Sequence, residues 1–374
     1  MAKARGWVMV GPGKLELQEF EIPKVAEDAA LMKIEACGIC GTDKHAFHGF
    51  MKNAPFPMIM GHEFIGTIVE IGKTANEKMA VLGGGPLKEG DRLAIAPSSL
   101  PCGRCWYCLH MPHRPSFCTS RTIYGINSTK NPPSIWGGFA EYIYLHSKTW
   151  AFKIPPKMST ERAVQTEPMA TGLRAVERAF NPGEAFMGEG YGAGKTVMVL
   201  GAGPIGLMVI AALRATGASL ILAQDLLKSR LEMAKRLGAD SVVDGKVPFE
   251  DRLKQVQALT DGVGPDVVIE AAGAPPAFQD ALAFVRRGGK LIEVGHFTDP
   301  GVTEIHPFTI CFKDLDIHGS WAYPPIMFKD ALAVLARSPL PLDEVVTHSF
   351  PLSELPKALE KVGTEGAGKI VIKP

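Results

Sequence analysis

The chain has almost no excess of either charge, since 40 Lys and Arg residues stand against 39 Asp and Glu. Proteins that bind nucleic acid or anionic membranes usually cluster basic residues, and the sequence has no basic run. Its apolar stretches are all interrupted by Gly, Pro or a charge, so none reaches the roughly 20 residues of a transmembrane helix. We therefore expect neither nucleic acid nor membrane as a partner.

Cysteine is also scarce, with 7 residues among 374. A sparse, odd number cannot form a disulfide scaffold, and the opening MAKARGWVMV lacks the apolar core of a secretory signal, which favours a reduced cytoplasmic setting. Four of the seven gather in and after the run PCGRCWYC. They are Cys102, Cys105, Cys108 and Cys118. Thiolates at Cys-x-x-Cys spacing suit a tetrahedral metal, so the sequence predicts a structural zinc site.

Two alternatives to this zinc site follow from the same residues. The four cysteines could form disulfides or a redox Cys-x-x-Cys, although a third Cys at the same interval is not needed for redox work. Cys118 follows Cys108 only after a long interval that contains His110 and His113. Either histidine could replace Cys118 as the fourth ligand.

The length of 374 residues predicts two or three domains, and a hydrophobic content of 46% supplies more than one core. The first 165 residues are predicted to form an irregular β region of short strands, at LMKIEA, FIGTIVEIG, DRLAIAP and FAEYIYL. From Thr196 short strands alternate with helices, which is typical of a parallel α/β sheet. Helices are expected at 204–215, 228–237, 277–285, 328–337 and 355–362, with a last strand at 369–373.

A glycine-rich turn opens this α/β region. Gly201, Gly203 and Gly206, with Pro204 and Ile205 between them, lie between a strand and a helix as in a dinucleotide-binding motif, where the helix amides meet the phosphates.

The residues after the next strand bear on the choice of coenzyme. Asp225, 24 residues after Gly201, can accept the ribose hydroxyls and would repel a 2′-phosphate, which favours NAD. Asp225 could instead only cap the following helix. Arg230 and Lys228 follow closely and could neutralise it, so use of both coenzymes stays open.

A second candidate metal site combines ACGICGTDKH with GHEF. Cys40 and His62 lie 22 residues apart, on loops that could meet in the fold. A catalytic zinc needs few protein ligands and an open position, and this pair suits such a site. The alternative for His62 is a buried histidine that is satisfied by backbone groups.

These motifs together resemble a known family. The segments CGTDKH and GHE, the close cysteines, Glu167 with Pro168, and GAGPIG are similar, in order and along the whole chain, to zinc-dependent alcohol and polyol dehydrogenases of the medium-chain dehydrogenase/reductase family. The sorbitol and threonine dehydrogenase branch is the most similar. The resemblance implies an α/β fold: a GroES-like catalytic domain at 1–165, a Rossmann doubly wound parallel sheet at 166–320, and a return to the catalytic domain at 321–374.

The resemblance also implies a catalytic ligand set. Cys40 and His62 are expected to bind zinc, with Glu167 in the place where classical alcohol dehydrogenases have a second Cys. Glu63 is a competing ligand, and the two carboxylates can exchange places. This ligand set would be Cys, His, Glu and water.

Further roles are implied for residues near these ligands. Thr42 would hydrogen-bond the substrate oxygen, His45 would end a proton relay through the nicotinamide ribose, and Asp43 would hold the ring of His62. The alternative for Thr42 and Asp43 is a loop turn or a helix cap. Thr171 is expected to contact the nicotinamide. Lys369 is expected to contact the pyrophosphate, or alternatively to be a solvated charge.

The implied activity is reversible hydride transfer from a secondary alcohol or polyol to NAD, which gives the ketone. The cofactors are NAD and two zinc ions per chain, one catalytic and one structural, and the partners are the small substrate and further copies in a homodimer or homotetramer. Two alternatives are reduction of an activated double bond without zinc, and a non-catalytic protein that keeps the fold. Intact Cys40, Thr42, His45 and His62 count against both.

The remaining expectations concern less regular segments. Residues 74–91 and 181–196 are predicted to be surface insertions, the second alternatively a flap near the substrate. Cys37 and Cys311 are predicted to be small core residues. The substrate pocket is expected to be lined by four largely aromatic residues, namely His48, Phe50, Trp136 and Trp321.

Overall fold

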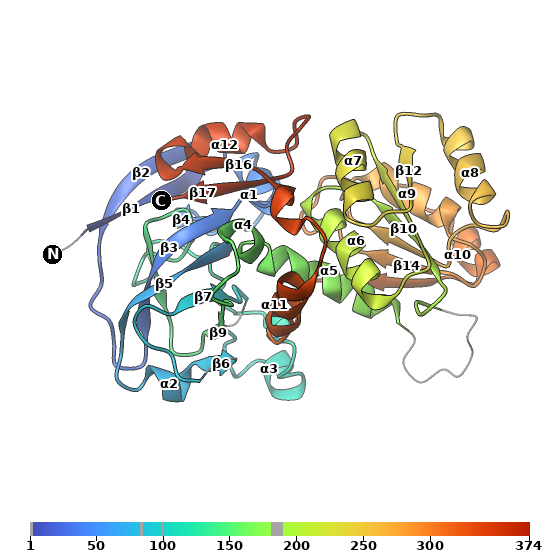
Figure 1. Cartoon of the computed structure of the whole chain (residues 1–374). Coiled ribbons are helices and arrows are strands. Elements are labelled where there is room, and N and C mark those ends of the chain that lie inside the picture. The colour runs from blue at the N-terminus through green and yellow to red at the C-terminus, as the bar shows by residue number, and fades with distance from the viewer. Residues whose placement is uncertain (1–2, 83–84, 99, 181–189) are drawn as a thin grey trace. The chain divides into compact units, whose positions relative to one another are not determined.

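The structure is a computed structural model that describes residues 3–82, 85–98, 100–180 and 190–374 (Figure 1). Its contacts divide the chain into two compact units. The first comprises Met1–Glu167, Tyr323–Arg337 and Val346–Pro374, and the second comprises Pro168–Ala322 and Ser338–Val345. The expected C-terminal return at 321–374 is therefore interrupted, because Ser338–Val345 belongs to the second unit.

The first unit is built on β-sheets. An eight-stranded sheet has the order β16-β17-β3-β5-β7-β9-β6, with β8 paired to β3, and a smaller sheet has the order β2-β1-β4. The strands are β1 Lys3–Gly11, β2 Lys14–Glu21, β3 Ala30–Gly38, β4 Met58–Ile59, β5 Glu63–Ile71, β6 Ala80–Leu82, β7 Arg92–Ile95, β8 Tyr142–Leu145, β9 Trp150–Lys153, β16 Val346–Pro351 and β17 Lys369–Lys373. The helices are α1 Gly41–Phe47, α2 Ala75–Lys78, α3 Trp106–His110, α4 Thr160–Ala163, α11 Met327–Arg337 and α12 Leu355–Lys361.

Pairing of β3 with β5 positions the candidate metal ligands. The two strands run antiparallel, and Gly38 at the end of β3 pairs with Glu63 at the start of β5. Cys40 lies two residues beyond the end of β3, and His62 lies one residue before β5. The register of one strand pair therefore brings together residues that are 22 positions apart in the sequence.

The second unit is a parallel sheet of the order β12-β11-β10-β13-β14-β15. Its strands are β10 Thr196–Leu200, β11 Leu220–Asp225, β12 Ser241–Asp244, β13 Val267–Glu270, β14 Lys290–Glu293 and β15 Asp316–Gly319. The helices are α6 Pro204–Thr216, α7 Lys228–Arg236, α8 Phe249–Ala258, α9 Pro275–Phe284 and α10 Pro307–Lys313, and α5 Thr166–Ala179 spans the boundary between the units. The strands are apolar because both faces of such a sheet are covered, as Met198, Leu222 and Val268 at zero exposure show. The expected α/β class with a Rossmann sheet is confirmed.

The predicted insertion at 74–91 is more than a surface excursion. It contains α2 and β6, and β6 pairs in parallel with β9. Met79 and Leu87 are buried, and the Asn76 side chain binds both the amide and the carbonyl of Leu87. The prediction was wrong because alternating apolar residues were too few to reveal a strand of three residues. Of the second predicted insertion, residues 181–189 lie outside the described residues.

Three expectations about single side chains can also be compared with the structure. Cys37 is fully buried, as predicted, whereas Cys311 is exposed on α10 and is not a core residue. Trp136 has 4% exposure and donates its indole N–H to the carbonyl of Asn131 at 2.7 Å. It packs in the core of the first unit and exposes little surface, and its expected contact with the substrate stays a prediction.

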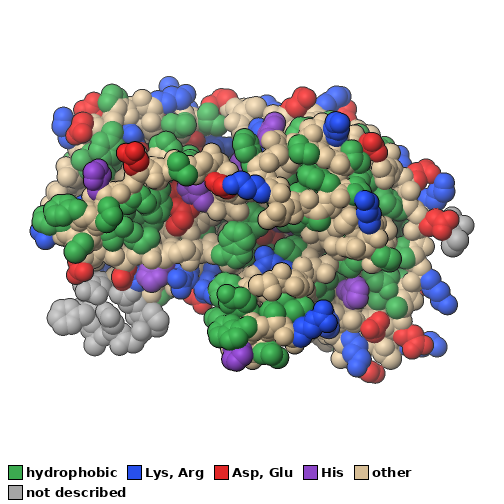
Figure 2. Space-filling model, turned by 180° about the vertical axis from the view of Figure 1, so that it is seen from behind, with side chains coloured by type: hydrophobic (Ala, Val, Ile, Leu, Met, Phe, Trp, Pro, Cys, Tyr) green, Lys and Arg blue, Asp and Glu red, His purple; other side chains and the backbone are tan. Residues whose placement is uncertain are grey.

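The surface agrees with the balanced composition. On the face drawn in Figure 2, Lys and Arg side chains alternate with Asp and Glu side chains. Among the helices that the structure describes, none is long and apolar enough to cross a membrane.

Candidate active site

The first catalytic candidate, Cys40, lies at the start of a short helix. It is the N-cap residue of α1, and its amide donates to Asp43 Oδ2 at 2.8 Å. This bond satisfies a backbone donor and fixes the Asp43 carboxylate in the first turn of the helix. Thr42 Oγ1 and Cys40 Sγ are hydrogen-bonded at 3.6 Å. Asp43 therefore does cap the helix, as the alternative interpretation predicted. Its carboxylate also contacts a second residue of the site, His62.

The second contact of Asp43 is made to His62. His62 Nδ1 lies 3.7 Å from Asp43 Oδ1 and is a buried atom with no hydrogen-bond partner among the described residues. Burial lowers the pKa of His62, but the Asp43 carboxylate and Cys40 outweigh it and raise the pKa well above its usual value. With Nδ1 facing Asp43, the ring leaves Nε2 available for a ligand.

Gly61 sets the course of the chain into His62. Its φ is +89°, and a Cβ there would lie 2.7 Å from Cys37 Sγ and 2.8 Å from Phe139 Cδ1. The position therefore requires glycine for both conformation and space. The Gly61 amide also points at Asp43 Oδ1, at 3.4 Å.

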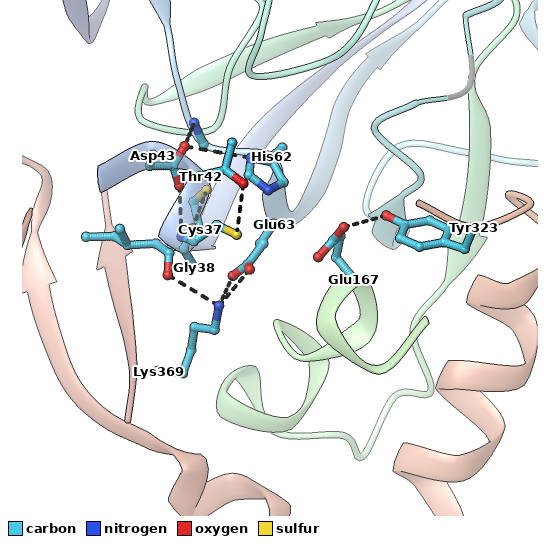
Figure 3. A network of polar contacts seen from close by, with 12 residues as sticks. Cys37, Gly38, Thr42, Asp43, His62, Glu63, Glu167, Tyr323 and Lys369 are labelled. Carbon is cyan, nitrogen blue, oxygen red and sulfur yellow. Dashed lines mark hydrogen bonds and ion pairs between the residues drawn. The ribbon is translucent and has the colours of Figure 1, made fainter. Parts of the chain in front are cut away.

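Glu63 and Lys369 form a buried ion pair beside these residues (Figure 3). Lys369 Nζ donates to Glu63 Oε1 at 2.6 Å and to the carbonyl of Ile39 at 3.3 Å. Burial lowers the pKa of Lys369, but Glu63 and Cys40 outweigh it, so the pKa is raised and the ammonium is retained. With 1% exposure Lys369 is not a solvated charge, so that alternative is wrong. Its contact with a pyrophosphate stays a prediction.

Three ligand types converge at this point. One ligand atom each from Cys40, His62 and Glu63 lies within 4.8 Å of the others. A thiolate, an imidazole and a carboxylate are donors that zinc accepts. His62, whose Nδ1 faces Asp43, and Glu63, whose charge is balanced by Lys369, fit a metal ligand set better than a core of neutral side chains.

Glu167, the other expected carboxylate, does not belong to this group of three. It lies at the start of α5 and accepts a hydrogen bond from the hydroxyl of Tyr323 at 2.7 Å (Figure 3). Burial raises the pKa of Glu167, His62 lowers it and Glu63 raises it, so Glu167 is close enough to sense both. The exchange of Glu63 with Glu167 stays a prediction.

Tyr323 is a site residue that the sequence did not reveal. It is 3% exposed, and burial together with the Glu167 carboxylate raises the pKa of its hydroxyl well above the usual value. A neutral hydroxyl that donates to Glu167 stabilises the ionised carboxylate. The two residues are 156 positions apart, so no local pattern could have linked them.

Thr42 and His45 lie three residues apart on α1, which places them on one face of the helix. Thr42 is buried beside Cys40, whereas His45 is half-buried and packs edge-on against Phe50. Burial lowers the pKa of His45, and the neighbouring His48 and Lys44 lower it further. His45 is therefore a neutral imidazole near neutral pH.

The four cysteines of the second candidate metal site also converge. Ligand atoms of Cys102, Cys105, Cys108 and Cys118 lie within 4.8 Å of one another, and all four thiols are free. The amide of Cys108 is the main cause that lowers the pKa of Cys105 to about 6, which favours the thiolate form that binds metals. The fourth converging atom belongs to Cys118, whereas the ring of His110 stacks on Trp106 at 4.5 Å and its Nδ1 lies 2.9 Å from the Trp106 carbonyl.

The glycine-rich turn connects β10 to α6 as expected. Gly201 has a φ of +90°, and a Cβ on it would lie 2.6 Å from the amide of Ala272. A Cβ on Gly206 would lie 1.8 Å from the carbonyl oxygen of Gly201. Gly203 is the N-cap of α6, and Pro204 and Ile205 form its first turn. The backbone amides at this helix start are suited to phosphate oxygens.

Asp225 ends β11 beside this turn. Its Oδ2 accepts from the Ala202 amide at 2.8 Å and its Oδ1 from the Leu227 amide at 2.9 Å. Arg230 Nη1 lies 3.6 Å from Oδ2. The Asp225 carboxylate thus binds one amide of the glycine turn and one amide at the start of the next segment. The Arg230 guanidinium lies beside it. Thr171, the expected nicotinamide contact, lies on α5 in the second unit.

Comparison with known proteins gives consistent matches along the chain. Residues 26–156 match the alcohol dehydrogenase GroES-like domain, and residues 204–337 match the zinc-binding dehydrogenase domain. A D-arabitol-phosphate dehydrogenase of Enterococcus avium is 30% identical, with 97% of this chain and 95% of that protein aligned. A sorbitol dehydrogenase of Bacillus subtilis is 32% identical, with 95% and 92% aligned.

A solved structure shares the whole fold. A Sinorhizobium meliloti protein, whose structure contains NADP, is 28% identical and has a TM-score of 0.84, with 100% of both chains covered. The converging ligands of the first unit fall within the GroES-like match, and the zinc-binding dehydrogenase match begins at Pro204, within the glycine turn of the second unit. The chain therefore belongs to the zinc-dependent alcohol and polyol dehydrogenases of the medium-chain dehydrogenase/reductase family and is a zinc-type oxidoreductase.

Proposed function

We propose that this protein oxidises a secondary alcohol or polyol to the ketone, reversibly, with NAD as the hydride acceptor. The convergence of Cys40, His62 and Glu63 carries this proposal, because it assembles three metal-ligating side chains in the first unit. The relatives from Enterococcus avium and Bacillus subtilis are named for polyol substrates, which supports the substrate class.

The chain's own residues would divide the work of the catalytic site. Cys40, His62 and one of the carboxylates Glu63 and Glu167 would hold the zinc ion, which when bound supplies a Lewis acid that lowers the pKa of an alcohol. Asp43 orients the His62 ring through Nδ1. Lys369 neutralises Glu63 and keeps its carboxylate next to the other two ligands.

Two residues of α1, Thr42 and His45, would remove the proton of the substrate hydroxyl. Thr42, beside Cys40 Sγ, is placed to accept a hydrogen bond from the substrate hydroxyl and to pass the proton on. His45 lies on the same helix face as a neutral imidazole and would take the proton as a general base. Thr171 and Lys369 are proposed to contact the coenzyme.

A substrate screen tests this function directly. Purified protein would be supplied with NAD and a panel of secondary alcohols, polyols and polyol phosphates, while the absorbance of NADH is followed. We expect NADH formation with at least one polyol and little with primary alcohols of similar size. Reduction of an activated alkene without any alcohol oxidation would contradict the proposal.

The four-cysteine cluster is proposed to hold the second zinc ion of each chain. Cys118→Ser should lower the zinc content from two ions per chain to one, because it removes one of four thiolate ligands. His110→Ala and His113→Ala are the matched controls and should keep two zinc ions. Elemental analysis of the three variants measures the content. Loss of zinc in a histidine variant with retention in Cys118→Ser would reverse the ligand assignment.

Preference for NAD is proposed to rest on the charge of Asp225. Asp225→Asn removes that charge and keeps an acceptor for the Ala202 amide, so the preference for NAD over NADP should fall about tenfold or more, equivalent to about 1.4 kcal/mol. Arg230→Ala is the companion variant and should weaken NADP use only. The ratio of kcat/KM values for the two coenzymes is the measurement. An unchanged ratio in Asp225→Asn would refute the role of the carboxylate.

A further inference from the structure

Two carboxylates lie side by side in the second unit and belong to neither of the two zinc ligand groups described above. Glu270 ends β13, Glu293 ends β14, and the two are paired in register in the parallel sheet. Like charges placed directly opposite on neighbouring strands repel, so such a pair needs a compensating charge. His296 follows three residues after Glu293 and returns toward both carboxylates.

The donor atoms of these residues converge closely. His296 Nδ1 lies 2.9 Å from Glu293 Oε1 and 3.4 Å from Glu270 Oε2. Ligands bonded to one metal ion at about 2.1 Å lie about 3.0–3.4 Å from each other in octahedral or tetrahedral geometry. The separations therefore equal those between neighbouring ligands of a small divalent ion. One ligand atom from each residue lies within 4.8 Å of the others.

Two oxygen atoms in the group are buried without a hydrogen bond. Glu270 has no solvent exposure, and its Oε1 accepts the amides of Ala272 and Gly273 at 2.8 and 3.0 Å. Its Oε2 faces His296 and, like Glu293 Oε2, accepts no hydrogen bond from the described residues. A buried carboxylate oxygen without a donor is costly, so a further ligand is expected at this point.

The charge of the group also calls for a cation. Among the ion pairs formed by the described residues, His296 is the only basic partner of either carboxylate. A divalent ion bound between the two carboxylates would neutralise the charge of both.

We propose that Glu270, Glu293 and His296 form a binding site for a divalent first-row transition metal ion such as Mn²⁺. One imidazole and two carboxylates are a harder ligand set than the thiolate sites of this chain, and Mn²⁺ prefers such ligands. The side chains of Glu293 and His296 are 21% and 23% exposed, which gives the ion a route from solvent. All three residues lie in the second unit, at or just beyond the carboxyl ends of β13 and β14.

The probe is Mn²⁺ added to the zinc-loaded full-length protein. Thiolate sites retain zinc against Mn²⁺, so bound Mn²⁺ reports on oxygen and nitrogen ligands. The signal of free aqueous Mn²⁺ in electron paramagnetic resonance falls as the ion binds. We expect one bound Mn²⁺ per chain, with an affinity at least tenfold lower in Glu293→Gln and in His296→Asn.

Two controls keep this test decisive. Glu304→Gln, an exposed carboxylate of the same unit, should leave Mn²⁺ binding unchanged, and circular dichroism should show that all variants are folded. Absence of Mn²⁺ binding, or binding that is equal in wild type and in Glu293→Gln, would overturn the proposal. A protonated-carboxyl infrared band that persists in excess Mn²⁺ and is lost in Glu293→Gln would show instead that the two carboxylates share a proton.

Discussion

His62→Ala and Cys40→Ser are each expected to lower kcat about a thousandfold or more. The loss corresponds to about 4 kcal/mol of transition-state stabilisation, which is the scale expected when Lewis-acid assistance is removed. His62 and Cys40 are two of the three converging ligands, so each change removes one of the few metal-binding side chains of the group. Steady-state oxidation of the best alcohol from the substrate screen measures the effect.

NADH binding is the control for both variants. The glycine turn at 201–206 and Asp225 belong to the second unit, whereas Cys40 and His62 belong to the first. The dissociation constant of NADH, from quenching of tryptophan fluorescence, should therefore change less than about twofold, or less than about 0.4 kcal/mol. Near-normal kcat in either variant would disprove the catalytic assignment.

Lys369→Met is expected to lower the free energy of unfolding by about 3–5 kcal/mol. The change leaves the Glu63 carboxylate without its cation in a site where both side chains have at most 1% exposure. An uncompensated buried charge is costly, whereas the pair itself contributes little net stability. Urea denaturation measures the effect as a shift of the midpoint.

Two further variants isolate the buried charge as the cause. Glu63→Gln combined with Lys369→Met removes both charges and should recover much of the lost stability. Lys357→Met breaks an exposed pair with Glu354 and should have little effect, because solvent screens that pair. Equal midpoints for Lys369→Met and Lys357→Met would show that the buried pair does not stabilise the site as described.

Much of the fold could be predicted because local patterns determine it. The apolar strands and the glycine turn around Gly201 lie within a single βαβ unit, and observed α6 at Pro204–Thr216 differs from the expected helix by one residue. The β1–β2 hairpin was not predicted. Its β2 strand is mostly exposed, so it lacks the regular apolar alternation that signals a half-buried strand.

The candidate site was predictable only in part, because some of its contacts join residues that are far apart in the sequence. Cys40, His62 and Glu63 lie in short motifs that resemble a known family, and the β3–β5 register then brings them together. Tyr323 and the partner role of Lys369 depend on contacts across 156 and 306 residues. No local pattern encodes such contacts, so Lys369 could not be distinguished from a solvated charge before the structure showed its burial.

The most direct test of the catalytic site measures zinc content and alcohol-dependent NADH formation on the same sample of Cys40→Ser. If Cys40, His62 and Glu63 hold the catalytic ion, zinc should fall from two ions per chain to one, and turnover should fall in parallel. The four-cysteine cluster should account for the zinc that remains. Wild-type turnover in a sample that has lost the zinc ion bound by Cys40 would contradict the assignment.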